Sequence, residues 1–214
     1  MEIPLIPPLN AGAGPDEKRH AMRELPEIEL SHALWIPRPR GLKVSARPAH
    51  DGRRLLILYT VIEPATRAKY IHDQDPVYTD SCVEFFFAPA PGQPYCNFEW
   101  NAIGTMLAGC GVSRQNRRRL DRNDLTRVER TSSLGREPIE ERNRISSWEL
   151  LVAIPADLIG ATGAEATLSG LRIVANFCKC GDELPEPHYL SWARIDTVTP
   201  DFHRPEFFRP LKFR

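Results

Sequence analysis

Polar side chains alternate with apolar ones in two aromatic-rich segments, and these polar residues have the types and spacing needed for chemistry. Glu84 lies in SCVEFFFAP, residues 81–89, while Glu99 and Asn101 lie in YCNFEWNAIGTMLAG, residues 95–109. Successive side chains of a β-strand point to opposite faces, so each segment is expected to have one apolar and one polar face. Two acids on neighbouring strands could act as a general acid and base. Alternatively, the acids and amides could hydrogen-bond the hydroxyls of a sugar, or simply face solvent.

The last loop of the chain holds a second group of candidate binding residues. TVTPDFHRPE, residues 197–206, places Phe202, His203 and Arg204 between two prolines. Proline restricts the backbone, so this loop is expected to be rigid. Phe202 and His203 lie outside the expected apolar faces, which makes the loop a candidate ligand site.

A sugar site also needs an aromatic ring, because the apolar C–H face of a pyranose stacks on one. Tyr78, Trp192 and Phe202 lie near the ends of expected strands. An aromatic side chain is more often part of a core than of a binding surface, and we expect that role for Trp192. Tyr78 and Phe202 are predicted to face each other across a shallow groove. Its polar rim would hold Glu84, His203 and Arg204.

One acidic loop could bind a metal ion. IHDQDPVYTDS, residues 71–81, contains Asp73, Asp75 and Asp80. Calcium takes six to eight oxygen ligands, and three carboxylates could begin such a shell, with backbone carbonyls completing it. The alternative is a polar loop in which an aspartate caps a turn.

The elements that must position these residues are mostly strands. Short apolar or alternating runs are separated by Gly, Pro and Asp turns, and helix is expected only near residues 64–71 and 155–160. The pattern predicts an all-β fold, namely an antiparallel two-sheet β-sandwich of the jelly-roll or immunoglobulin-like kind with very little helix. The strand-like runs lie at residues 55–63, 81–89, 95–109, 146–154 and 171–183.

The domain organisation is simple. Residues 1–27 are rich in Pro and Gly and are predicted to form an extension with little structure of its own. Residues 28–214 are predicted to form the sandwich as one domain, because no linker or internal repeat divides them.

Charge and hydropathy limit the classes of partner. Lys and Arg together number 28, and so do Asp and Glu together, which gives a net charge of zero. No overall electrostatic field therefore favours nucleic acid. The basic run RQNRRRLDR, residues 114–122, lacks interleaved aromatic residues and is expected to be a solvated hairpin loop.

The chain has no run of about 20 apolar residues that would predict a membrane span. Its start lacks the features of a secretory signal, which fits a cytoplasmic protein, or an exported one whose leader was removed.

The cysteines do not follow a zinc-binding spacing, since the Cys-x-Cys pair lacks a second pair of ligands. Buried free thiols are expected, and one disulfide is allowed if the protein is exported. The five are Cys82, Cys96, Cys110, Cys178 and Cys180.

Four motifs, in this order, resemble the family 9 carbohydrate-binding modules: TDSCVEFFFAP, YCNFEWNAIGT, SSWELLVAIPADLIG and NFCKCGDELPEPHYLSWARIDTVTPDFHRPEFFRPLKF. The chain is more closely similar to the family-9-like domains of bacterial proteins, within the wider DOMON-type β-sandwiches, over residues 28–214. The resemblance implies a non-catalytic sandwich that grips a sugar at or near a chain end between two aromatic side chains, often with structural calcium. Tyr78 and Phe202 match the two clamp aromatics, and Glu84 matches the acid of the DS-x-VE strand.

The expected function is therefore that of a non-catalytic module that binds a mono- or oligosaccharide. One alternative is an interaction sandwich that has lost sugar binding. A glycan-acting enzyme would use Glu84 and Glu99, and a haem-binding DOMON-type domain would use Met106 as an axial ligand. The sequence lacks a Gly-x-Ser-x-Gly motif, a metal-ligand cluster and a Gly-rich phosphate loop, so its motifs do not support catalysis.

Overall fold

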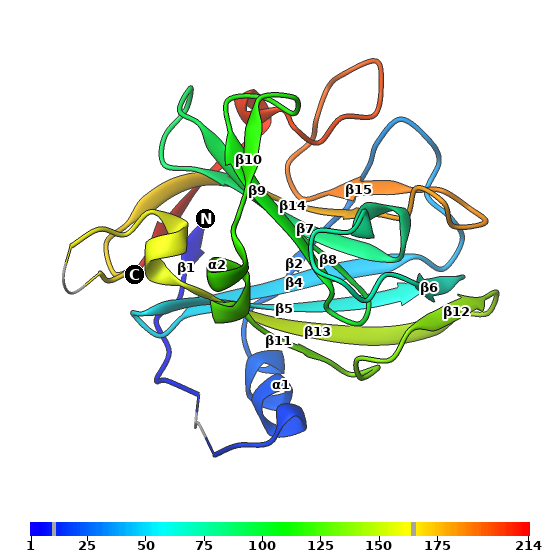
Figure 1. The fold of residues 1–214 in the computed structure, drawn as a ribbon, viewed down its shortest axis with the longest axis horizontal. Helices are drawn as coiled ribbons and strands as arrows, with labels where there is room; N and C mark the ends of the chain where they lie inside the picture. Colours follow the sequence, from blue (N-terminus) through cyan, green and yellow to red (C-terminus); the bar gives the residue numbers. More distant parts are fainter. Residues whose placement is uncertain (10–11, 164–165) are drawn as a thin grey trace.

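A computed structural model describes residues 1–9, 12–163 and 166–214 as a sandwich of β-sheets (Figure 1). A nine-stranded sheet packs on a five-stranded sheet, and two short strands form a third, small sheet. Nearly all neighbouring strands are antiparallel. These features confirm the predicted all-β sandwich.

The nine-stranded sheet follows the order β1-β16-β14-β7-β8-β9-β10, with β15 paired to β14 and β3 paired to β15. Its centre therefore consists of strands from both halves of the chain. The strands are β1 (Glu2–Ile3), β3 (His32–Ala33), β7 (Cys82–Ala88), β8 (Tyr95–Asn101), β9 (Met106–Gly111), β10 (Arg117–Arg119), β14 (Arg172–Cys180), β15 (Tyr189–Ser191) and β16 (Arg209–Phe213).

The five-stranded sheet follows the order β11-β13-β5-β4-β2, and the small sheet pairs β12 with β6. The long strands β5 and β13 contain continuous runs of apolar residues, as expected for strands buried on a sandwich core. The strands are β2 (Ile28–Glu29), β4 (Lys43–His50), β5 (Arg54–Glu63), β6 (Thr66–Ala68), β11 (Glu129–Ser132), β12 (Ile139–Arg142) and β13 (Ser146–Pro155).

The main core lies between the two large sheets. On β7, Val83, Phe85 and Phe87 point into this core, as the alternation of the sequence predicts. For the other face of β7, with Cys82 and Phe86, the sequence allowed either a solvated surface or a shallow binding groove. In the structure this face is covered by a second apolar cluster that includes Leu34, Val77, Ile195, Phe202 and Phe208 from loops and short turns.

Helices contribute little to the fold. The described residues contain α1 (Pro15–Arg23) and α2 (Arg122–Arg127), and the 3-10 turns η1 (Val77–Thr79), η2 (Ala156–Ile159) and η3 (Pro205–Phe207). The single helical turn predicted near residues 155–160 is confirmed as η2, which ends at Gly160 with a positive φ of 97°. The segment 64–71 is not helical, because its centre pairs as β6 with β12. Among the described residues, no helix is both long and apolar enough to cross a membrane.

The first 27 residues have more structure than their composition indicates. Strand β1 pairs with the last strand, β16, and Ile3 is fully buried in the main core. Met22 of α1 is also fully buried, in a cluster against the five-stranded sheet. Arg23 of α1 donates to Glu149 of β13 with N–O distances of 2.8 and 2.6 Å. This segment therefore adds an edge strand to the nine-stranded sheet and covers part of the outer face of the five-stranded sheet.

The cysteines fall into two groups. Cys96 and Cys110 lie opposite each other on β8 and β9 and form a disulfide. Cys82, Cys178 and Cys180 are buried free thiols, as expected for structural cysteines. The one disulfide considered from the sequence is therefore present, across a strand pair.

Candidate functional site

A cavity of about 310 Å³ lies over the outer face of the nine-stranded sheet, beneath the loops that carry the second apolar cluster. Strands β7, β8 and β14 form its base, and strand β10 with the loops after β3, β9, β14 and β15 contributes its walls. Its lining combines aromatic, basic and carboxyl side chains. The residues used below are Trp35, Tyr78, Glu84, Glu99, Arg114, Arg117, Cys180, Asp182, Tyr189, Phe202 and His203.

Three aromatic side chains, Trp35, Tyr189 and Phe202, form one wall of the cavity, called here the aromatic wall. The ring centroid of Trp35 lies 5.5 Å from that of Tyr189 and 5.5 Å from that of Phe202. The indole Nε1 of Trp35 donates to the carbonyl oxygen of Thr197 at 2.9 Å. Trp35 also has a positive φ of 61°, which is uncommon for a bulky residue and marks a position held by its surroundings.

Tyr78 adds a further aromatic surface from a different element. It lies in the 3-10 turn η1, and 36% of its surface is exposed. Its carbonyl oxygen accepts a hydrogen bond from the backbone N–H of Asp182, which ties η1 to the loop after β14. Tyr78 and Phe202 thus line the same cavity, although Phe202 is only 8% exposed and belongs to the aromatic wall.

Two carboxyl groups form the base of the cavity. Glu84 on β7 and Glu99 on β8 are direct cross-strand partners, and their exposed fractions are only 3% and 4%. Burial, followed by the neighbouring carboxyl of Glu99, raises the pKa of Glu84 well above its usual range. Burial likewise raises the pKa of Glu99 to about 7, against the opposing effect of Arg117. Near neutral pH this base therefore carries less negative charge than two free carboxylates would.

A hydrogen-bond network joins this base to the last loop. Asn97 donates to Glu99 Oε1, and Arg117 Nη2 donates to Asn97 Oδ1. Arg117 Nη1 lies 3.1 Å from His203 Nδ1, and the Tyr95 hydroxyl lies 2.9 Å from the same nitrogen. A guanidinium can only donate, and Arg117 Nη1 also lies 3.4 Å from Nε2, so the shorter contact favours Nδ1 as the acceptor and places the proton on Nε2. Burial, and next the charge of Arg117, lowers the pKa of His203 to about 3, so this imidazole is neutral.

One oxygen of the base lacks a partner. Glu99 Oε2 is buried, and no protein group among the described residues hydrogen-bonds it. A buried acceptor without a partner costs about 1–3 kcal/mol. Because Glu99 lines the cavity, a ligand hydroxyl or a water molecule in the cavity could supply the missing donor.

Five of the seven predicted sugar-binding residues line this cavity: Tyr78, Glu84, Glu99, Phe202 and His203. Asn101 and Arg204 lie outside the lining and have other contacts. Asn101 is fully buried, and its Nδ2 donates to Tyr70 O at 2.9 Å and to Asp80 Oδ2 at 3.1 Å. Arg204 pairs with Glu206 at 2.5 Å and lies over the ring of Phe207.

The three aspartates considered for calcium do not form a shared site. Asp80 is fully buried and accepts from Arg67 Nε at 3.1 Å, while Asp73 accepts from Arg130 Nη1 at 2.7 Å. Among the described residues, the group of ligand atoms that meets within 4.8 Å is instead that of Cys82, Glu84 and Cys180. Arginines thus already neutralise two of the three aspartates, Asp73 and Asp80. The three aspartates therefore do not fit a calcium ion.

Several lining residues were not predicted as site residues. Trp35, Asp182 and Tyr189 join the cavity only through folding, because they lie far from Glu84 and Glu99 in the sequence. The basic run 114–122 was interpreted as a solvated loop, but its middle forms β10, and Arg117 is half-buried in the cavity. The unusual density of arginines in RQNRRRLDR was the signal that could have identified it.

Met106, the residue considered for haem ligation, is fully buried in the main core between the sheets. It lies on β9, outside the cavity lining. The structure therefore does not place this thioether where a cofactor in the cavity could reach it.

Comparison with known proteins identifies the family. The model of carbohydrate-binding family 9 matches residues 18–213. The chain belongs to carbohydrate-binding family 9. A search of curated proteins found no match.

Solved structures share the fold of this family 9 domain. A protein from Bacteroides uniformis, provisionally assigned as carbohydrate-binding, is 35% identical with a TM-score of 0.89, and the match covers 100% of this chain and 98% of that one. Family 9 modules from Caldicellulosiruptor kristjanssonii have been solved with glucose and with cellotriose. The glucose complex is 12% identical, with a TM-score of 0.59 and coverage of 100% and 95%. The cellotriose complex is 11% identical, with a TM-score of 0.62 and coverage of 100% and 93%.

Proposed function

We propose that this family 9 domain binds a mono- or oligosaccharide in the cavity over the nine-stranded sheet, and that it does so without catalysing a reaction. The observation that carries the proposal is the combination of an aromatic wall with a buried carboxyl oxygen, Glu99 Oε2, that lacks a protein partner. A sugar has both an apolar face and hydroxyls that donate, so it complements both features.

The sugar ring would lie on the aromatic wall. A pyranose that stacks on Phe202 also approaches Trp35, because the two ring centroids are 5.5 Å apart. Tyr78, which is partly exposed at the same cavity, offers a second surface from η1. This arrangement extends the expected pair of Tyr78 and Phe202 to a larger aromatic surface.

The hydroxyls of the sugar would bind the base and the basic side of the cavity. Glu99 Oε2 would accept from one hydroxyl, and Arg117 can donate to the oxygen of another. The neutral His203, with its proton on Nε2, is a further donor. A polar base fixed by the strand register needs little reorganisation on binding, which lowers the entropic cost.

The family supports a binding role without catalysis, and the glucose and cellotriose complexes of the Caldicellulosiruptor modules support a sugar as the ligand. Glu84 and Glu99 are the one pair of carboxyls in the cavity base that could suggest an enzyme. Incubation of the protein with oligosaccharides should leave their lengths unchanged, and release of shorter sugars would contradict the non-catalytic role.

The test of binding is calorimetric titration with glucose and cellotriose, with a glycan array to extend the range of sugars. We expect a dissociation constant of about 10 μM to 1 mM for the preferred sugar, equal to roughly −7 to −4 kcal/mol. Phe202→Ala should weaken binding at least tenfold. Phe207→Ala is the matched control, because Phe207 is a nearby aromatic outside the cavity lining. Equal affinities of both variants and the wild type would show that the cavity is not the sugar site.

A further inference from the structure

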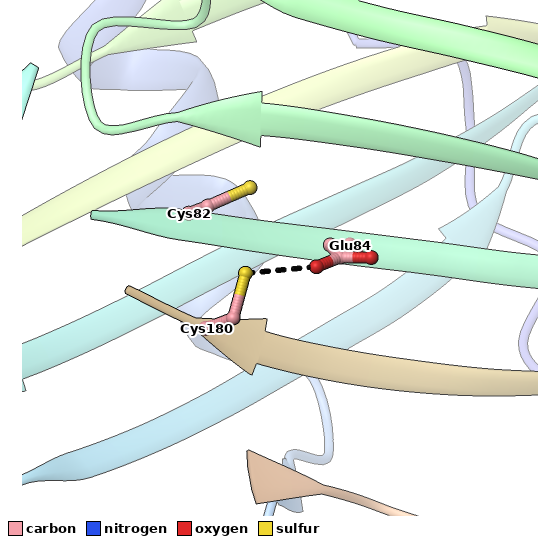
Figure 2. A group of neighbouring side chains, drawn as sticks. All are labelled: Cys82, Glu84 and Cys180. Atoms are coloured by element: carbon pink, nitrogen blue, oxygen red, sulfur yellow. Dashed lines mark hydrogen bonds between the residues drawn. The ribbon is translucent and has the colours of Figure 1, made fainter. Parts of the chain in front are cut away.

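The register of two neighbouring strands creates a compact group of sulfur and carboxyl side chains. On the β7–β14 ladder, Cys82 is opposite Cys180, and Glu84 is opposite Cys178. Direct partners on antiparallel strands share a face, and so do residues two apart on one strand. Cys82, Glu84 and Cys180 therefore meet on the outer face of the sheet, as Figure 2 shows.

The atoms of this group are close enough to share one ion. The two Sγ atoms and a Glu84 carboxyl oxygen all lie within 4.8 Å of one another. The Cys180 thiol donates to Glu84 Oε1 at 2.9 Å, the contact dashed in Figure 2. A tetrahedral zinc ion with Zn–S bonds of about 2.3 Å holds its sulfur ligands roughly 3.8 Å apart. The spacing of the group is compatible with such a site after small side-chain shifts.

We propose that Cys82, Glu84 and Cys180 bind a thiophilic divalent cation of the zinc class, with one coordination position open to the cavity. Thiolate ligands select zinc-like ions, whereas calcium and magnesium prefer oxygen ligands. Three protein ligands and an open position are a common arrangement for zinc. The fourth ligand would be water from the cavity.

Access and charge both support this site. Glu84 and Cys180 line the cavity, so an ion can reach the group from solvent without opening the sheet. Two thiolates and one carboxylate would leave a charge of −1 around a divalent ion. Arg117 lines the same cavity, and its charge acts on Glu84, so it would offset that remaining charge.

A neighbouring thiol provides a matched control. Cys178 is fully buried on the same face of the same ladder, but it lies outside the group of converging ligand atoms. Cys178→Ser should therefore leave metal binding intact, whereas Cys82→Ser and Cys180→Ser should weaken it at least a hundredfold. Glu84→Gln should weaken it about tenfold, because the amide oxygen is a poorer ligand.

The experiment is a titration of the metal-free protein, with the Cys96–Cys110 disulfide intact, by Cd²⁺ and by Co²⁺. One equivalent of Cd²⁺ should produce thiolate charge-transfer absorption, and Co²⁺ should give visible bands of tetrahedral coordination that Zn²⁺ removes. Failure of the wild type to bind would overturn the proposal. Loss of binding in Cys178→Ser but not in Cys82→Ser would do so as well.

A second measurement uses only the wild type, so that it does not depend on the folding of a variant. X-ray absorption of the zinc-loaded protein should show two sulfur neighbours at about 2.3 Å and oxygen neighbours at about 2.0 Å. A shell without sulfur would contradict the site. Cys82 lies outside the cavity lining, so Cys82→Ser should lose metal binding and retain sugar affinity. The metal proposal and the sugar proposal can therefore fail independently of each other.

Discussion

Lys179 Nζ lies 2.9 Å from Glu63 Oε2, and both side chains are fully buried. Lys179 belongs to β14 of the nine-stranded sheet and Glu63 to β5 of the five-stranded sheet, so the ion pair joins the two sheets. The ammonium group also contacts Cys180 O and His188 Nε2, each at 2.8 Å. The ammonium group therefore has two hydrogen-bond acceptors and an opposite charge at ion-pair distance, which is the condition under which a buried charge is tolerated.

Lys179→Met is expected to destabilise the protein by about 3–5 kcal/mol, because it leaves Glu63 as an uncompensated buried charge. Urea denaturation of both proteins measures the difference. Lys69→Met is the control, since Lys69 makes a partly exposed ion pair with Glu183 at 3.0 Å, and such pairs contribute about 0–1 kcal/mol. Similar losses in the two variants would show that the buried pair has no special role.

The stability of the protein should fall as the pH decreases from about 6.5 toward 3, and His188 should account for part of this loss. Burial, and next the charge of Lys179, lowers the pKa of His188 to about 3. Between these values the unfolded histidine binds a proton that the folded one excludes, so the free energy of unfolding rises with pH in this range. Each unit of pKa difference is worth about 1.4 kcal/mol.

The free energy of unfolding of His188→Asn, measured by urea titration between pH 3.5 and 7.5, should depend less on pH than that of the wild type. His20→Asn is the control, because His20 lies on the exposed face of α1. Parallel pH profiles of wild type and His188→Asn would exclude His188 as a source of the acid sensitivity.

Arg117→Met is expected to weaken sugar binding at least tenfold, because the variant loses a donor in the cavity and the hydrogen bonds to Asn97 and His203. Calorimetry measures the affinity. The charge of Arg117 also lowers the pKa of His203, so the NMR titration of His203 should move to higher pH. Arg118→Met is the control, since Arg118 is an exposed neighbour on β10 outside the cavity lining. An unmoved His203 titration would contradict the network described above.

Addition of calcium to the metal-free protein is expected to leave its melting temperature unchanged, because Arg67 and Arg130 already neutralise Asp80 and Asp73. Asp80→Asn should instead destabilise the protein by about 3 kcal/mol, since Asp80 is buried and paired with Arg67. Asp75→Asn should change stability by less than about 0.5 kcal/mol. A calcium-dependent increase in melting temperature, abolished in Asp75→Asn, would restore the calcium site.

The alternation of the sequence predicted which side chains of β7 face the main core, because a strand has a period of two residues whatever its neighbours are. It therefore identified Val83, Phe85 and Phe87 as core residues and placed Glu84 on the other face. The pairing of Glu84 with Glu99 also followed, since two strands joined by a short turn are commonly neighbours.

Local patterns could not show what covers that other face. The aromatic wall joins Trp35 to Tyr189 and Phe202 across more than 150 positions of sequence, and only the path of the chain brings them together. The same is true of Cys82 and Cys180, whose contact depends on the β7–β14 register. The sequence by itself therefore determined the strands and the direction of their side chains. The tertiary structure decided that the polar face is buried beneath loops, and burial is what changes the ionisation of Glu84 and Glu99.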